Sequence, residues 1–316
     1  MSSPFTVCRA AKLEKLLPKT TSRWLIESLW AESAVGILGG EPKCGKSLLA
    51  LEIALAVAAG CACLGRFAIA RPGPVLFFAA EDSAAIVHHR VHAIARARHI
   101  ELDPLELFFL HTPALRLDHD ADRMRLSATV ERWKPRLVVL DPFVRLHAVD
   151  ENSAGEVAPL LAYLRSLQRK FDTAILLVHH SRKAAAHLRD GQALRGSSEL
   201  HAWGDSNLYL RRRGQQLSLS IEQRAFASPA DLRLRLRAEN DDLSLEIIAD
   251  DPAADLQSIP AHRRIEQAIA SAAKPPTLAE LRAACRIRNS TLCQILNELT
   301  AQGRVRRHNA AYHLAT

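Results

Sequence analysis

The chain has 316 residues, of which 48% are hydrophobic and 24% are charged, a composition typical of a globular protein with room for one large and one small domain. No apolar run is long enough and free enough of charge to cross a membrane, and the first residues lack the apolar core of a signal peptide, so we expect a cytoplasmic protein. Six scattered cysteines without zinc-ligand spacing predict reduced, structural thiols.

The net charge of +8 is unevenly distributed along the chain. From Ser258 to the C-terminus there are nine lysine or arginine residues and only three glutamate residues. A concentration of positive charge in one segment predicts a polyanionic partner such as a nucleic acid. A merely solvated basic face is the alternative explanation.

The most informative motif follows an apolar strand predicted at residues 35–40. This strand runs into Gly40-Glu41-Pro42-Lys43-Cys44-Gly45-Lys46-Ser47, and a helix-forming run follows from Leu48. Such a glycine-rich segment between a strand and a helix is a P-loop. Its backbone N–H groups face phosphates, Lys46 reaches the β- and γ-phosphates, and Ser47 binds Mg²⁺. We therefore expect residues 40–48 to bind ATP together with Mg²⁺.

Apolar runs alternate with amphipathic helical runs from Val35 to about Arg212. Strands are predicted at 74–80, 107–111, 136–141, 173–180 and 207–211, and helices at 83–98, 120–133 and 155–170. This alternation is typical of an α/β fold, with a mostly parallel sheet covered by helices on both faces. At 216–223, 232–239 and 243–248 apolar residues recur at every second position instead, which predicts antiparallel strands at the edge of the sheet.

Acidic residues at the ends of two predicted strands are candidates for the chemistry at the phosphates. Asp141 ends the 136–141 strand after four apolar residues, the position of a Walker B carboxylate that binds Mg²⁺. Glu81 follows the 74–80 strand and would reach the same edge of the sheet, where a carboxylate can orient the attacking water. Asp82 competes for that role, but its expected function is to cap the helix that begins at Ser83.

Histidines and basic residues follow the later strands. His179 and His180 end the 173–180 strand, where one of them would contact the γ-phosphate; strand alternation lets only one face it, and the sequence leaves open which. In the basic loop at 181–196, Arg182 and Lys183 are candidates to bind the backbone of a nucleic acid, unless the loop is simply solvated. The candidates for an arginine that acts on the γ-phosphate of a neighbouring subunit are Arg211, Arg212, Arg213 and Arg195.

Residues 249–260, with two prolines and several acidic residues, are predicted to be a linker. Beyond it, helices are predicted at 262–273, 278–287 and 290–303, followed by a basic β-ribbon at 304–314. Three helices and a ribbon predict a winged helix-turn-helix domain at 261–316, after an ATPase domain at 1–248. A small helical lid or oligomerisation module is the alternative. The candidate DNA-binding residues in this domain are Arg286, Arg288, Arg304, Arg306 and Arg307.

The chain resembles the RecA-like P-loop ATPases, and in particular the RepA-type hexameric replicative helicases. The resemblance is carried by GGEPKCGKS, FFAAED, LVVLDPF, LLVHHSRK and LRGSSELHAWGDSNLYLRR, in that order between about Trp24 and Ile248. It implies a six-membered ring that holds ATP between subunits and single-stranded DNA in its channel. By this likeness one subunit supplies Lys46, Ser47, Glu81, Asp141 and a histidine of the 179–180 pair, and its neighbour supplies an arginine.

These observations favour a DNA-dependent ATPase, acting as a ring-forming replicative helicase of a plasmid, phage or other mobile element. In this interpretation the C-terminal domain binds duplex DNA. Two alternatives remain open. The chain could be an ATP-gated regulator that binds DNA without separating its strands, or a recombination or loading accessory.

Overall fold

The computed structural model describes residues 7–12, 23–180, 198–214, 216–248, 261–272, 274–285, 289–308 and 311–315. Contacts between Cα atoms divide the chain into two compact units, Met1–Ile248 and Ala249–Thr316. Buried hydrophobic residues form two core clusters within the larger unit and one within the smaller. The predicted linker at 249–260 lies outside the described residues.

The larger unit is built on a nine-stranded sheet with the order β11-β10-β9-β8-β3-β7-β6-β4-β5. The strands are β3 (Val35–Gly40), β4 (Val75–Ala79), β5 (Leu107–Phe109), β6 (Leu137–Asp141), β7 (Ala174–His180), β8 (Ser206–Arg213), β9 (Gln216–Gln223), β10 (Leu232–Glu239) and β11 (Asp242–Ile247). The central strand β3 pairs in parallel with both β7 and β8, and β9 to β11 continue from β8 in antiparallel pairs. The predicted fold, a mostly parallel sheet with antiparallel edge strands, is confirmed.

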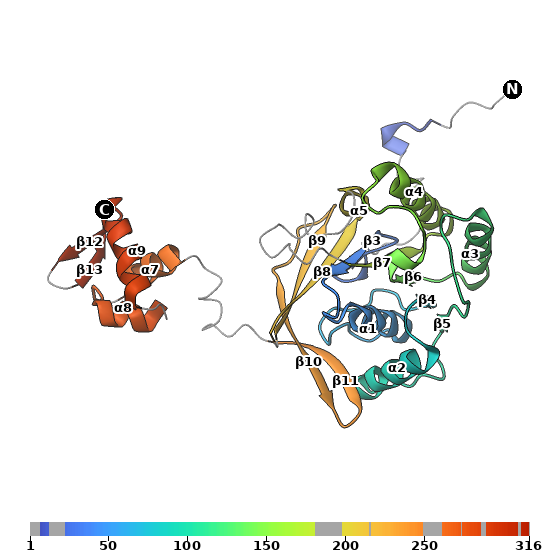
Figure 1. The fold of residues 1–316 in the computed structure, drawn as a ribbon, viewed down its shortest axis with the longest axis horizontal. Helices are drawn as coiled ribbons and strands as arrows, with labels where there is room; N and C mark the ends of the chain where they lie inside the picture. Colours follow the sequence, from blue (N-terminus) through green and yellow to red (C-terminus); the bar gives the residue numbers. More distant parts are fainter. Residues whose placement is uncertain are drawn as a thin grey trace. The chain divides into compact units, whose positions relative to one another are not determined.

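Helices cover both faces of the parallel part of the sheet (Figure 1). Buried residues of α1 (Lys46–Ala59) and α2 (Ala84–Arg98) form a core with one face. Those of α3 (Asp120–Trp133) and α4 (Ala154–Phe171) form a second core with the other face, which the short helix α5 (Ser198–Trp203) also joins. β3, β6 and β7 are therefore buried from both sides, which explains their continuous apolar sequences. Among the described residues, no helix is long and apolar enough to cross a membrane.

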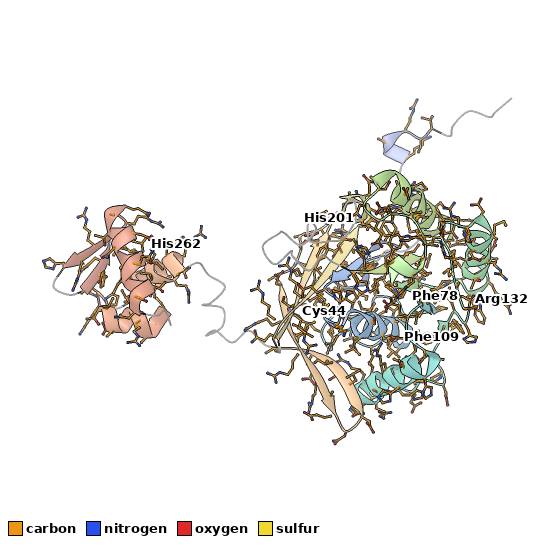
Figure 2. The ribbon with its side chains drawn as sticks, viewed as in Figure 1. Cys44, Phe78, Phe109, Arg132, His201 and His262 are labelled. Atoms are coloured by element: carbon orange, nitrogen blue, oxygen red, sulfur yellow. The ribbon has the colours of Figure 1, made fainter. Side chains whose placement is uncertain are left out.

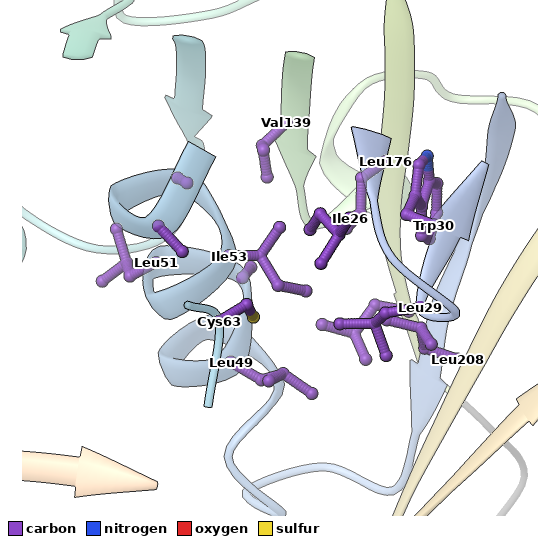
Figure 3. Packing of buried hydrophobic residues seen from close by; sticks show 14 of the residues in the cluster. Ile26, Leu29, Trp30, Leu49, Leu51, Ile53, Cys63, Val139, Leu176 and Leu208 are labelled. Carbon is purple, nitrogen blue, oxygen red and sulfur yellow. The ribbon is translucent and has the colours of Figure 1, made fainter. Parts of the chain in front are cut away.

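A short N-terminal hairpin precedes the P-loop strand and was not predicted. It consists of β1 (Trp24–Ile26) and β2 (Trp30–Ala31). The side chains of Ile26, Leu29 and Trp30 pack into the same core as residues of α1 (Figure 3). The indole of Trp30 also donates a hydrogen bond of 3.3 Å to the carbonyl of Ala34. The hairpin thus closes one side of the core beneath the P-loop helix.

The smaller unit contains α7 (Ala261–Ser271), α8 (Leu278–Cys285), α9 (Asn289–Ala301) and the ribbon of β12 (Val305–His308) and β13 (Ala311–Leu314). Its core includes Ile265, Leu281, Leu292, Leu296 and Val305. Helix α8 begins with a reciprocal cap, in which Glu280 accepts a hydrogen bond of 2.7 Å from the Thr277 N–H and Thr277 Oγ1 accepts one of 3.4 Å from the Glu280 N–H. Among the described residues of this unit, three helices are followed by a ribbon, which is the element order of a winged helix.

A buried ion pair ties together α1, α2 and β11. Glu52 of α1 lies 2.6 Å from Arg98 of α2, and their side chains are 4% and 16% exposed. Arg98 also donates to the carbonyl of Leu245 at 2.8 Å, and Glu52 accepts from the N–H of Leu64 at 3.1 Å. Burial raises the pKa of Glu52, and the guanidinium of Arg98 opposes this rise. The carboxylate therefore depends on Arg98 to remain charged.

We expect Arg98→Ala to lower the free energy of unfolding by about 3 kcal/mol or more at pH 8, because it leaves a buried carboxylate without its partner. A carboxyl whose pKa is raised on folding contributes stability that is complete below its unfolded pKa, about 4.3, and is lost as the pH rises through the folded value. The loss in Arg98→Ala should therefore be smaller at pH 5 than at pH 8 in urea unfolding. The double variant Glu52→Gln/Arg98→Ala should lack this pH dependence, and a loss equal at both pH values would contradict the assignment.

Candidate nucleotide-binding site

A cleft of about 650 Å³ opens where the central strands end. The P-loop residues Pro42 to Leu48 form one side of it. Glu81 after β4, Asp141 at the end of β6 and His180 at the end of β7 also line it. An apolar wall comes from the antiparallel strands through Leu217, Leu236, Leu243 and Leu245. With Ala79 of β4 and Arg212 of β8, described residues from seven strands and the P-loop therefore converge on one cavity.

The two glycines of the P-loop have different structural roles. Gly45, the N-cap of α1, has φ of 102°, a conformation that residues with a Cβ rarely adopt. Gly40 has no room for a side chain, because a Cβ there would lie 2.3 Å from the carbonyl oxygen of Leu210 on β8. Cys44 lies in the β3–α1 loop (Figure 2) and directs its Sγ to the same Leu210 carbonyl at 3.4 Å. The P-loop is thus anchored to β8.

The amine of Lys46 lies inside the curve of the P-loop. Its Nζ donates hydrogen bonds to the carbonyls of Gly40 at 3.0 Å and Glu41 at 2.7 Å. Burial lowers the pKa of Lys46, while the carboxylates of Asp141 and Glu81 act to raise it. A cation held among carbonyl oxygens at a helix N-terminus is placed to bind the negatively charged oxygens of a phosphate.

Ser47 and Asp141 meet at the base of the cleft. Both residues line the cleft, and the Asp141 carboxylate is only 6% exposed. Burial raises the pKa of Asp141 to about 6, and the Ser47 hydroxyl and the charge of Lys46 oppose that rise. A hydroxyl and a carboxylate side by side beside a phosphate site are the oxygen donors that Mg²⁺ prefers. The two residues therefore fit a metal site.

Glu81 lies at the mouth of the same cleft, and it is held by a partner that the sequence did not indicate. Arg145, in the 3-10 helix η2 (Phe143–Arg145) after β6, donates from Nε to Glu81 Oε1 at 2.7 Å. The side chains are 62% and 43% exposed, respectively, so water reaches both. Arg145 keeps the carboxylate oriented without closing the entrance.

The expected role of Asp82 as a helix cap is wrong. Helix α2 begins at Ala84, and Ser83 is its N-cap, with Oγ accepting from the N–H of Ile86 at 3.4 Å. Asp82 forms an ion pair with Arg90, in the second turn of the same helix, and both line the cleft. Ser83 competes successfully because its short side chain directly precedes the first turn.

The two histidines at the end of β7 have different surroundings. His180 lines the cleft, and burial and the charge of Lys46 lower its pKa. His179 is fully buried on the other side of the strand, with Nδ1 3.8 Å from Glu151 Oε1. The same oxygen lies 3.6 Å from Nε2 of His147. Burial acts to raise the pKa of Glu151, but the two imidazoles outweigh burial and lower it. Strand alternation thus directs only His180 to the nucleotide cleft.

Strand alternation also places the candidate arginines of β8 on two different faces of the sheet. Arg212 lines the cleft and donates to the carbonyl of Gly214 at 3.3 Å. Arg211 pairs in register with Ser218 of β9 and lies on the opposite face of the sheet. Arg213 follows on that same opposite face, and Arg195 lies outside the described residues.

The candidate DNA-binding residues fall partly outside the described residues, which exclude Arg182, Lys183, Arg286 and Arg288. In the smaller unit, Arg306 and Arg307 are exposed on the ribbon strand β12, and Arg307 lies over the ring of Tyr312. Arg304 precedes the ribbon and pairs with Glu266 of α7 at 2.8 Å. The structure therefore places Arg306 and Arg307 on the ribbon and holds Arg304 against the helical part.

Sequence reasoning missed several residues in the cleft or in contact with its lining. Arg145 and Arg90 carry no motif, and only the fold brings them to Glu81 and Asp82. The four leucines of the apolar wall belong to strands whose alternation was recognised, but alternation does not reveal which cavity a strand face borders. An apolar wall beside a phosphate site suits the base or ribose of a nucleotide.

A P-loop between β3 and α1, in a parallel sheet whose next strands bring acids to the same cleft, defines a nucleotide-dependent P-loop ATPase with a RecA-like fold. Residues 8–186 match the sequence model of the AAA domain family, and the chain belongs to this family. Among solved structures, it is similar to the crystal structure of the RadB recombinase, with a TM-score of 0.49 and 15% sequence identity. That similarity covers 69% of this chain and 92% of the recombinase chain.

We expect Asp141→Asn to raise the free energy of unfolding at pH 8, measured without Mg²⁺ or nucleotide. The folded pKa of about 6 lies above the unfolded value. The carboxyl therefore contributes stability below about pH 4 that is lost as the pH rises through 6, about 3 kcal/mol in all. The asparagine variant should be more stable than wild type by up to this amount at pH 8 and nearly equal at pH 4. A variant less stable at pH 8 would contradict the raised pKa.

Proposed function

We propose that the chain is a DNA-dependent ATPase that acts as a ring-forming replicative helicase of a plasmid, phage or other mobile element. The observation that carries the catalytic part is the cleft itself, which Lys46, Ser47, Glu81, Asp141 and His180 line together. These are the groups that hydrolysis of a γ-phosphate needs, on one chain and in one cavity.

Each residue of the cleft has a proposed role. Backbone N–H groups of residues 40–48 and the amine of Lys46 bind the phosphates. Ser47 and Asp141 would hold Mg²⁺, and the ion would supply positive charge beside the phosphate oxygens. Glu81 orients the attacking water and accepts a proton from it. Arg145 fixes the position of the Glu81 carboxylate. The leucines of β9 to β11 border the space that remains for the nucleoside.

Two further roles are proposed. His180 contacts the γ-phosphate, and Arg212 contacts the nucleotide held by a neighbouring subunit. His180 lies at the end of a buried strand and lines the cleft. Arg212 is exposed at the rim, which suits an arginine that reaches a nucleotide held by another subunit. Arg211 lies on the other face and is the weaker candidate for this role. In a ring, preferably of six subunits, the exposed mouth with Glu81 would be covered by the neighbour.

The proposed DNA contacts on the smaller unit rest on its element order and charge. Its ribbon presents Arg306 and Arg307 to solvent, and α9 presents Ser290 and Thr291 near its N-terminus. A helix with short polar side chains and a basic ribbon suit a duplex, whose phosphates the arginines would bind. Arg286 and Arg288 remain proposed contacts from sequence alone, as do Arg182 and Lys183 for a single strand in the ring channel.

A second candidate function is an ATP-gated DNA-binding regulator or accessory that does not unwind DNA. The observation that favours it is the separate basic unit, with a core of its own, attached to the ATPase. Such a protein would bind duplex DNA and change its oligomeric state with ATP. It would show no strand displacement.

The deciding experiment is steady-state ATP hydrolysis measured against rising concentrations of single-stranded DNA. We expect strong stimulation of the wild type. In Glu81→Gln and in Lys46→Ala, hydrolysis should fall by on the order of 10²-fold or more, because each removes an interaction with the reacting groups. Lys46→Ala should still bind duplex DNA through the smaller unit. A slow rate that ignores single strands would favour the regulator, and unchanged turnover in Lys46→Ala would disprove the site.

The two histidines provide a matched pair for a second prediction. His180→Gln should lower kcat by on the order of tenfold or more with little change in KM or in thermal stability, because the side chain lines the cleft but is not part of the core. His179→Gln should instead lower the unfolding temperature, since that ring is buried beside Glu151 and Phe143. The same loss of kcat in both variants, or a stability loss in His180→Gln alone, would contradict the assignment of His180 to the nucleotide and His179 to the core.

A further inference from the structure

Strand alternation gives β8, β9 and β10 two different faces. Leu217, Leu219 and Leu234 point into the core shared with α1 and α2. The opposite face carries five arginines and is here called the arginine face. Its members are Arg211 and Arg213 on β8, and Arg233, Arg235 and Arg237 on β10.

The strand register brings these arginines together. Ser218 of β9 pairs with Arg211 on one side and with Arg233 on the other. The two arginine-bearing strands are thus separated by one strand with a short side chain, about 10 Å from each other. Along each strand the arginines repeat at about 7 Å, every second residue. Arg213 and Arg235 are exposed, whereas Arg211 and Arg233 are partly buried.

The acidic residues near this face are engaged elsewhere. Glu246, which pairs in register with Arg235, lies 3.5 Å from Arg237, and Glu239 lies 2.8 Å from that same guanidinium. Asp242 binds Arg96 of α2 at 3.0 Å. Glu222, at the far end of β9, lies 3.5 Å from His201. Among the described residues, the acids therefore gather on Arg237 and at the margins, and the end formed by Arg213 and Arg235 has the excess of positive charge.

We propose that the arginine face binds the phosphate backbone of a nucleic acid, with Arg213 and Arg235 as the main contacts. Guanidinium groups bind phosphates with two parallel hydrogen bonds, and Ser218 and Gln216 between them offer further donors. A row of charges on a sheet without a stacking aromatic would bind the backbone without reading sequence. The proposal takes DNA as the partner from the proposed function, but it assigns a third contact surface, distinct from loop 181–196 and from the smaller unit.

The position of this face suggests how DNA and nucleotide communicate. Arg212, between Arg211 and Arg213, points to the opposite face and lines the nucleotide cleft. Leu217 and Leu236, which also line the cleft, alternate with Gln216, Ser218, Arg235 and Arg237 in the same way. A phosphate bound by Arg213 is therefore one residue away from the cleft wall, so that a shift of β8 changes both surfaces together.

The test is binding of a fluorescent oligothymidylate to full-length Arg213→Glu/Arg235→Glu, measured by anisotropy at several salt concentrations. The matched control is Arg125→Glu/Arg169→Glu, which changes the charge equally on α3 and α4, at exposed positions. Both pairs are also made in an Arg306→Glu/Arg307→Glu background, which reduces binding by the smaller unit. Should the reversals unfold the protein, Arg213→Gln/Arg235→Gln replaces them.

We expect the arginine-face variant to lose about 20-fold in affinity near 0.1 M salt, with the slope of log K against log salt lower by about 1.4, the value for two contacts to a single strand. The control should bind like wild type. Equal binding by wild type and variant, or equal losses in variant and control, would overturn the inference while leaving the proposed function intact. Unchanged DNA binding with an altered oligomeric state would overturn it in favour of a contact between copies. If the wild type binds no DNA, the proposed function itself fails.

Discussion

The parallel pairing of β3 with both of its neighbours is the constraint on which the site depends. The register places Gly40 opposite His180 of β7 and opposite Leu210 of β8. Gly40 can approach Leu210 only because it has no side chain. The start of the P-loop, the cleft histidine and the strand that carries Arg212 are therefore fixed relative to one another by hydrogen bonds between backbones, before any side chain of the site contributes.

Electrostatics sets the second constraint, because the site gathers charges that burial opposes. Burial raises the pKa of Asp141 and lowers that of Lys46, so each ionised group relies on the other. The Ser47 hydroxyl offsets part of the cost for Asp141. Polar groups buried at such a cost are common where function, and not stability, determines the sequence. The Glu52–Arg98 pair is different, because it is a buried ion pair that joins α1 to α2 and so stabilises the fold.

The sequence was sufficient to predict the strands along the chain and their mostly parallel arrangement, and it indicated several residues that the structure places around one cleft. Apolar runs, strand ends and the P-loop each carry a local signal. The sequence could not decide between His179 and His180, because the histidine that faces the nucleotide is the one on the side of β7 where the cleft lies. It assigned the cap of α2 to Asp82, although Ser83 caps the helix and Asp82 finds Arg90. Arg145, Glu151 and the leucine wall depend on contacts between distant segments, for which no pattern along the chain exists. The N-terminal hairpin was missed because its strands have only three and two residues.

Cys44 has a consequence for the redox chemistry of the protein. A cysteine within a phosphate-binding loop would ordinarily expose the site to alkylation and oxidation, since such loops favour anions and so favour thiolates. Here the sulfur is buried against β8, it donates to the Leu210 carbonyl, and burial raises the pKa of the thiol. The group stays protonated near neutral pH and is a poor nucleophile. Nucleotide binding is thereby insulated from the oxidants that would inactivate a loop with an accessible thiolate at this position.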